Sequence, residues 1–176
     1  MIDAVHVRPA RINAGGRSIP GRFDTVLVGD GSGGDLGLAG KSIFLDSNQL
    51  IQLIDWLGWR VAQVRLIFHL PVKAAEVLFP DQESPRPAHL AYVDWFTPFT
   101  RTPDAVHGLY KVSHCFKDGA RYSGVVPVSS IKRGVHLYPD FGVQVPREWT
   151  SSTVLEQCQN FYVNPFADRH SYVTMY

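Results

Sequence analysis

Cysteine is scarce in this sequence, and neither sign of charge dominates it. The 176 residues include two cysteines, Cys115 and Cys158. These are too few for a disulfide scaffold, and they lack the Cys-x-x-Cys spacing of structural zinc sites. Lys and Arg number 17 against 16 Asp and Glu, a net charge of +1. This balance argues against a protein that coats nucleic acid with its whole surface.

Long apolar runs are also missing. No stretch approaches the roughly 18–20 apolar residues that span a bilayer. The start of the chain has no apolar core of the signal-peptide type. A length of 176 residues suits one globular domain. The sequence therefore predicts a soluble intracellular domain with no membrane partner.

Signatures of catalysis are absent as well. There is no Gly-x-Ser-x-Gly motif, and the glycine-rich run at 29–35 lacks the Gly-Lys-Ser/Thr ending of a phosphate loop. The seven histidines show no His-x-His or His-x-x-x-His spacing, although His107, His114 and His136 could meet across neighbouring strands. His114 and Cys115 are adjacent, so on a strand their side chains point to opposite faces. We expect no enzyme, no metal and no cofactor, and a zinc- or cysteine-dependent enzyme is the least favoured hypothesis.

Short segments with a two-residue period dominate the chain. In residues 60–68 the pattern places Ala62, Val64 and Leu66 on one face and Gln63 and Arg65 on the other. In residues 90–96, Asp94 is the one acid inside an apolar strand, and we expect it to pair with a nearby arginine. Further strand patterns lie at residues 22–28, 108–113, 123–128, 131–137, 161–164 and 171–176.

Two helices interrupt the strand patterns. An amphipathic helix is predicted over 46–57, and a shorter one over 152–158 with a capping box of Thr153 and Glu156. About seven short strands with one or two small helices predict an all-β fold, a small closed or nearly closed β-barrel. We expect this single β-barrel domain to cover residues 23–176 and to follow an extended basic lead-in over residues 1–22.

Aromatic residues are plentiful, at 12% of the chain. Most are expected to fill the barrel interior. An exposed group of them would form a groove or cage for a peptide or a methylated lysine through cation–π attraction. The candidate partner-binding residues are Tyr92, Trp95, Phe99, Tyr110 and His114.

Basic residues suggest an alternative function. The first 22 residues carry four arginines against one acid, Asp3. Such a segment could contact the phosphates of a nucleic acid. The candidate nucleic-acid-binding residues are Arg8, Arg11, Arg17, Arg22, Arg121, Lys132 and Arg133.

The order of motifs over about residues 60–164 resembles the bromo-adjacent homology (BAH) domain, a chromatin-associated β-barrel. The motifs are Val61-Ala-Gln-Val-Arg-Leu-Ile-Phe68, Tyr92-Val-Asp-Trp-Phe-Thr-Pro-Phe99, Gly108-Leu-Tyr-Lys-Val-Ser-His114, Val126-Pro-Val-Ser-Ser-Ile-Lys-Arg-Gly-Val-His-Leu137 and Phe161-Tyr-Val-Asn164. Histone-reading members of this family have a second aromatic residue at the position of Thr97. Of the aromatic residues that form their methyl-lysine cage, the resemblance therefore assigns only Trp95 in this sequence.

A second resemblance covers roughly residues 60–176. Three segments are similar in sequence to the C-terminal region of Plavaka-type transposases of mushroom-forming fungi. They are His136-Leu-Tyr-Pro-Asp-Phe-Gly142, Val154-Leu-Glu-Gln-Cys158 and Phe161-Tyr-Val-Asn-Pro-Phe166. The acidic nuclease core of such a transposase would then lie upstream of this chain.

The two resemblances imply a BAH-like domain carried at the end of a transposase-like protein, with a nuclear location. We therefore predict a non-catalytic protein-interaction module. Its expected partners are chromatin or a histone peptide, other parts of a transposase assembly, or a second copy of the chain. A nucleic-acid-binding accessory domain, with DNA as its partner, is the alternative.

Overall fold

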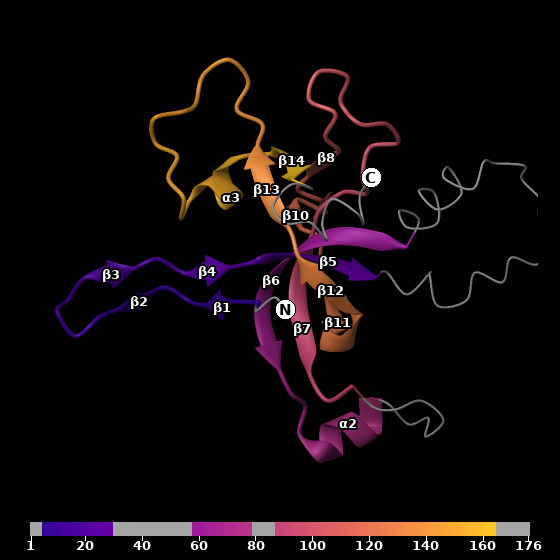
Figure 1. Cartoon of the computed structure of the whole chain (residues 1–176). Helices are drawn as coiled ribbons and strands as arrows, with labels where there is room; N and C mark the ends of the chain where they lie inside the picture. Colours follow the sequence, from indigo (N-terminus) through magenta and orange to yellow (C-terminus); the bar gives the residue numbers. More distant parts are fainter. Residues whose placement is uncertain (1–4, 30–57, 79–86, 165–176) are drawn as a thin grey trace, which may run out of the picture.

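The computed structural model describes residues 5–29, 58–78 and 87–164, and these residues are mainly β-structure (Figure 1). The predicted all-β class is therefore confirmed. The predicted helix at 46–57 and the predicted strand at 171–176 lie outside the described residues.

An antiparallel five-stranded sheet forms the centre of the molecule. Its strand order is β11 (Ser123–Pro127), β7 (Leu90–Trp95), β6 (Trp59–Phe68), β5 (Thr25–Gly29) and β12 (Ile131–Gly134). A short 3-10 helix, η2 (Val128–Ser130), joins the two edge strands directly. In a flat sheet those edges would stand about 19 Å apart, at about 4.8 Å per strand. The link can reach only about 14 Å, so the sheet must curl.

The concave face of the curled sheet holds one of two hydrophobic cores. Its buried members are Val26, Val28, Ala62, Val64, Ala91, Val93 and Trp95. Alternation along β7 sends Ala91, Val93 and Trp95 inward, as the sequence predicts. The predicted face of β6 holds for Ala62 and Val64 but is wrong for Leu66. A β-bulge at Arg65 shifts Leu66 to the outer face, beside Tyr92.

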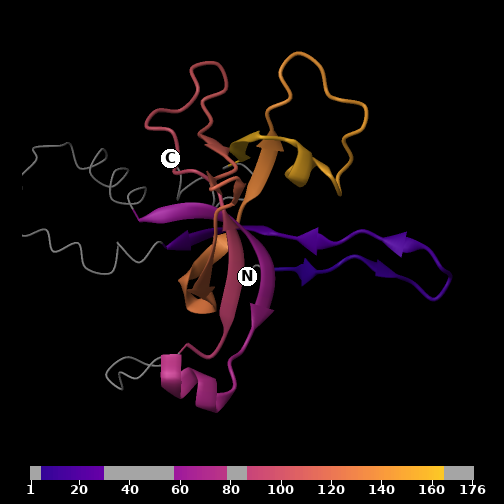
Figure 2. The same ribbon diagram turned by 180° about the vertical axis from the view of Figure 1, so that it is seen from behind.

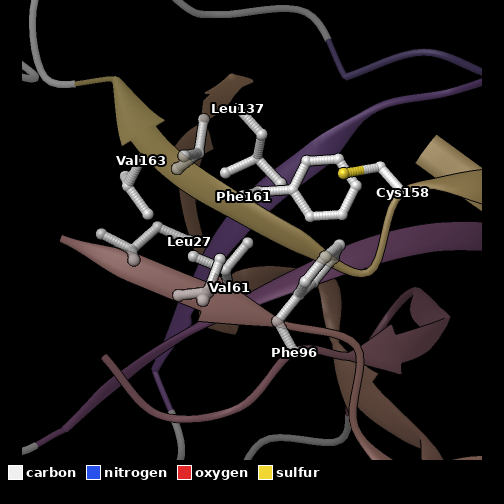
Figure 3. Close-up of a cluster of buried hydrophobic side chains, with 9 residues drawn as sticks. Leu27, Val61, Phe96, Leu137, Cys158, Phe161 and Val163 are labelled. Atoms are coloured by element: carbon white, nitrogen blue, oxygen red, sulfur yellow. The ribbon is translucent and has the colours of Figure 1, made fainter. Parts of the chain in front are cut away.

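A three-stranded antiparallel sheet covers the outer face of β5 and β6. It consists of β13 (His136–Pro139), β14 (Asn160–Asn164) and β8 (Lys111–Ser113). The second core lies between the sheets and contains Leu27, Val61, Phe96, Val112, Val135, Leu137, Cys158, Phe161 and Val163 (Figure 3). Since β5 and β6 contribute to both cores, their central residues are buried on both faces.

Three small elements complete the body of the molecule. A hairpin of β9 (Phe116–Lys117) and β10 (Ala120–Arg121) turns at Asp118 and Gly119, whose φ angles of 52° and 80° suit an Asp-Gly turn. Helix α2 is Val72–Leu78, and helix α3 is Val154–Gln157. The predicted short helix near 152–158 is present.

The predicted capping box of helix α3 does not form. Thr153 makes no capping bond, and its hydroxyl instead accepts the N–H of Thr150 at 3.0 Å. Glu156 turns toward Arg65 on β6, with 2.7 Å between Oε1 and Nη1. Tertiary ion pairing thus replaces the local hydrogen bond.

The lead-in is a long β-hairpin that projects from the body (Figures 1 and 2). We call residues 5–24 the arm. It contains β1 (Val7–Arg8), β2 (Arg11–Ile12), β3 (Ser18–Ile19) and β4 (Arg22–Phe23). Strand β1 pairs with β4, and β2 pairs with β3, and the ladder is interrupted between the two pairs, where Pro9 and Pro20 lack an N–H. The chain then runs from β4 directly into β5.

Candidate functional site

The five predicted partner-binding residues do not form one surface. Tyr92 is 41% exposed on the outer face of β7, between Leu66 and Val125 of the neighbouring strands. Phe99 and Tyr110 pack edge to face at 6.4 Å. Trp95 and His114 are buried.

Trp95 is a core residue, 8% exposed. Its ring lies in the concave core, and the Arg60 guanidinium stands 4.9 Å from the ring centroid. His114 stacks on Phe96 at 4.8 Å, and its Nε2 lies 2.8 Å from the carbonyl oxygen of Leu155. These two side chains support the body of the molecule, so no cage can form around Trp95 in this conformation.

Asp94 pairs with an arginine, as the sequence predicts. Its Oδ2 lies 2.6 Å from Nε of Arg65, and its Oδ1 accepts the hydroxyl of Ser123 at 2.7 Å. Arg65 also forms an ion pair with Glu156, whose Oε2 lies 3.5 Å from Nη2 of Arg121. Two acids and two arginines therefore balance one another, and no carboxylate of this cluster is left to bind a metal.

In the described part of the chain, no group of three His, Cys, Asp or Glu side chains is placed to hold a metal ion. Burial raises the pKa of the Cys158 thiol, despite hydrogen bonds to the carbonyl oxygens of Asn160 and Asp140. A thiol with a raised pKa is a poor nucleophile because the thiolate is the reactive form. His107 packs on Tyr162, and His136 packs on Tyr138.

The predicted basic residues fall into two groups. Arg8, Arg11, Arg17 and Arg22 all lie on the arm and are exposed. Arg121 belongs to the ion-pair cluster with Glu156, and Lys132 lies over the Trp59 ring at 5.9 Å. Arg133 follows Lys132 on β12. Only the arm brings several arginines together on one structural element.

A groove opens where the arm leaves the body. Val135 donates its N–H to the carbonyl oxygen of Thr25 at 2.8 Å, and beyond this bond β4 and β13 diverge. The opening has a volume of about 710 Å³. It is lined by residues 21–25 on one side, 134–139 on the other and 151–152 and 154–156 on a third. We call it the β4–β13 groove.

Both walls of the β4–β13 groove are strand edges with which no other described strand pairs. On β14, the N–H of Val163 donates to Tyr110, so the backbone of its neighbour Leu137 faces away from β14 and into the groove. Directly after β4, the N–H of Asp24 donates to the carbonyl oxygen of His6, so the backbone of Phe23 faces away from β1. Continuing the register from Thr25 and Val135 would place Phe23 opposite Leu137.

The floor of the β4–β13 groove mixes apolar and polar groups. Leu137, Leu155 and Phe161 contribute apolar surface. Gln63 also lines the groove and is only 2% exposed, and its Oε1 has no hydrogen-bond partner in the part of the chain that the structure describes. A buried acceptor without a partner is costly, so this atom favours a ligand that carries a donor.

Sequence reasoning did not identify Phe23, Gln63 or Leu137 as site residues. A signal was present in β6, where Gln63 interrupts a run of apolar residues. The unpaired edges have no sequence signal, since they depend on how two strands separated by 110 residues diverge.

No protein-family model, curated protein or solved structure matches the chain. Within residues 5–29, 58–78 and 87–164, no helix has the length and apolar character needed to cross a membrane.

Proposed function

We propose that the chain is a non-catalytic protein-interaction module that binds an extended segment of a partner protein in the β4–β13 groove. The observation that carries this proposal is the pair of unpaired strand edges, which continue one register on opposite walls of a 710 Å³ opening. An extended peptide satisfies such edges by adding a strand.

The backbone groups on the two walls suit this mode of binding. Leu137 offers one N–H and one C=O, whereas Pro139 offers only a C=O because proline has no N–H. On the other wall, Phe23 and Gly21 each offer both groups. The β4 wall is therefore the more complete template, and we expect the added strand to pair mainly with it.

The side chains of the groove define the preferred peptide. Asp24 is held by Arg22 at 3.0 Å, and Glu156 is held by Arg65, so the walls carry little unbalanced charge. The floor offers apolar contacts and the free acceptor of Gln63. We expect a segment that alternates apolar residues with donors such as Ser, Thr or Asn.

The resemblances suggest where such a segment comes from. A BAH-like layout implies that the partner is a chromatin protein or histone tail. The similarity to transposase sequences implies that it is another part of a transposase assembly or a second copy of the chain. Both imply a nuclear location. The groove binds backbone, which any extended segment supplies, and its side chains would select among these partners.

A peptide-display selection tests the proposal. The full chain is used to select binders from a library of extended peptides, and affinities are measured by fluorescence polarisation. Ser152 is exposed at the groove, so Ser152→Trp should obstruct it and weaken the selected peptides by roughly tenfold or more. Thr102→Trp, at an exposed site outside the groove, should leave binding unchanged.

A second readout follows the backbone directly. Bound peptide should protect the amide hydrogens of Phe23 and Leu137 from exchange, because both would gain hydrogen bonds. Failure to select any peptide, or selected peptides that tolerate Ser152→Trp, contradicts the proposal.

A further inference from the structure

The arm extends from the body with little packing to hold it. Ile12, near its tip, is 74% exposed. An isolated two-stranded hairpin is only marginally stable in water, because it has no third strand or core to bury its side chains. The arm reaches far beyond the two cores (Figures 1 and 2), which indicates a role outside folding.

The charge of the arm is entirely of one sign up to its base. Residues 5–23 hold four arginines and no Asp or Glu. Asp24, at the base, binds Nε of Arg22 at 3.0 Å. Among the residues that the structure describes, Arg8, Arg11 and Arg17 form no ion pair. Three guanidinium groups are therefore available to an external anion.

The arginines lie on both strands of the ribbon. Arg8 lies directly opposite Arg22. Arg11 lies opposite Ile19, and Arg17 lies two residues nearer the tip than Ile19. Like charges directly opposite each other destabilise a strand pair. The Arg8–Arg22 pair thus works against folding and favours a bound polyanion.

The dimensions of the arm match a nucleic-acid groove. Seven residues on each strand, from Val7 to Asn13, span about 20 Å at about 3.3 Å per residue. The major groove of B-form DNA is about 12 Å wide and accepts a two-stranded β-ribbon. The tip, Ala14-Gly15-Gly16, is small enough to approach the bases closely.

We infer that the arm is a DNA-binding ribbon that enters the major groove of a duplex, with the arginines of both of its strands contacting phosphates. Apart from Phe23 at its base, whose ring lies under Arg65, the arm has none of the large aromatic anchors that dominate protein–protein interfaces. Arginine, in contrast, suits phosphate because its planar group forms two parallel hydrogen bonds. This inference does not depend on the peptide proposed for the β4–β13 groove.

The test measures binding of the full chain to a 20-base-pair duplex of mixed sequence, by fluorescence anisotropy across KCl concentrations. Each phosphate contact lowers the logarithm of the affinity by about 0.9 per unit of log salt. We expect a slope of about −3 for the wild type, corresponding to the three unpaired arginines. The variant Arg8→Gln/Arg11→Gln/Arg17→Gln should lose most of this slope and bind roughly tenfold or more weakly at low salt.

A matched control variant distinguishes the general effect of losing positive charge from the effect of losing it on the arm. Arg101, Lys117 and Arg147 are exposed basic residues outside the arm, so Arg101→Gln/Lys117→Gln/Arg147→Gln should leave the slope near the wild-type value. Circular dichroism should show unchanged folding for both variants, because all six side chains are exposed. Equal losses in the two variants would overturn the assignment to the arm, as would no binding to DNA at low salt.

Competition by unlabelled polyanions identifies the class of anion that the arm prefers. Unlabelled duplex should displace the labelled duplex at roughly tenfold lower concentration than single-stranded DNA or polyglutamate of equal charge. Equal competition by polyglutamate would show general attraction to anions, and equal competition by single strands would exclude recognition of the groove. Ser152→Trp, which obstructs the β4–β13 groove, should not alter DNA binding.

Discussion

Arg65 binds Asp94 across neighbouring strands, with 2.6 Å between Nε and Oδ2. The contact depends on the β-bulge at Arg65, which inserts an extra residue into β6 and redirects the chain. Side-chain exposure is 22% for Arg65 and 9% for Asp94, so water screens the pair poorly. The ion pair ties β6 to β7 where β6 bends away from β5.

Removing one partner of this pair should be costly. We expect Asp94→Ala to lower the free energy of unfolding by about 3 kcal/mol, because Arg65 would lose the more buried of its two carboxylate partners. Urea denaturation measures the change. Glu156→Gln is the control, since Glu156 is 47% exposed and should contribute about 0.5 kcal/mol or less. Similar losses for both substitutions would show that burial does not govern this cluster.

Packing in the concave core leads to a second prediction, which concerns Gly124 on β11. A Cβ atom added there would lie 2.9 Å from Nε1 of Trp95, inside normal contact distance. We expect Gly124→Ala to cost about 1–3 kcal/mol through overpacking. At Gly134, also in a strand, the nearest atom would be 4.0 Å away, so Gly134→Ala should change stability by less. Thermal or urea unfolding compares the two.

The same core fixes the expected cost of truncating Trp95. Because the ring is buried, Trp95→Ala should lower stability by about 3–5 kcal/mol. Thermal melting checks this value. A variant that melts like the wild type would contradict the assignment of Trp95 to the core.

Much of the central sheet could be predicted from alternation alone. The strands near 60–68, 90–96 and 123–128 appear, since apolar and polar residues alternate along much of each. The single strand predicted at 131–137 is instead two strands, β12 and β13, which belong to different sheets. The bulge at Arg65 could not be predicted, because the residue types in this part of β6 do not mark the position of the extra residue. It inverted the expected position of Leu66.

The arm and the β4–β13 groove show two other limits. Proline and glycine in residues 9–21 suggest an extended lead-in, but the turn at Asn13–Gly16 also lets two strands pair. Gly16 has a φ of 74°, the left-handed conformation that such a hairpin turn requires. The groove arises from tertiary divergence of β4 and β13, so its residues carried no common motif.

A fourth prediction concerns the pH dependence of the arm's base. Burial alone would raise the pKa of Asp24, but hydrogen bonds from the His6 N–H, the Arg22 side chain and the His6 ring hold it below its ordinary value of 3.8. A carboxylate whose folded pKa is depressed stabilises the fold above its unfolded pKa. That contribution is lost as the pH falls below about 4 toward the folded pKa.

Urea midpoints of the wild type and Asp24→Asn, measured between pH 5 and pH 2.5, test this dependence. The wild type should be the more stable protein at pH 5, and the difference should shrink as the pH falls. A difference that stays constant over this range would show that the Asp24 charge does not anchor the arm. Asp118→Asn, at the tip of the β9–β10 hairpin, serves as an exposed control.

The two cysteines should differ sharply in reactivity. Cys158 is 2% exposed in the core between the sheets (Figure 3), and burial raises its thiol pKa. Cys115 is only partly buried. We expect iodoacetamide at pH 8 to modify Cys115 in the native protein and to reach Cys158 only on unfolding, because alkylation needs an accessible thiolate. Mass spectrometry of timed samples locates the label, and Cys115→Ser should remove the fast phase. Rapid native labelling of Cys158 would mean that the core between the two sheets opens far more readily than its packing predicts.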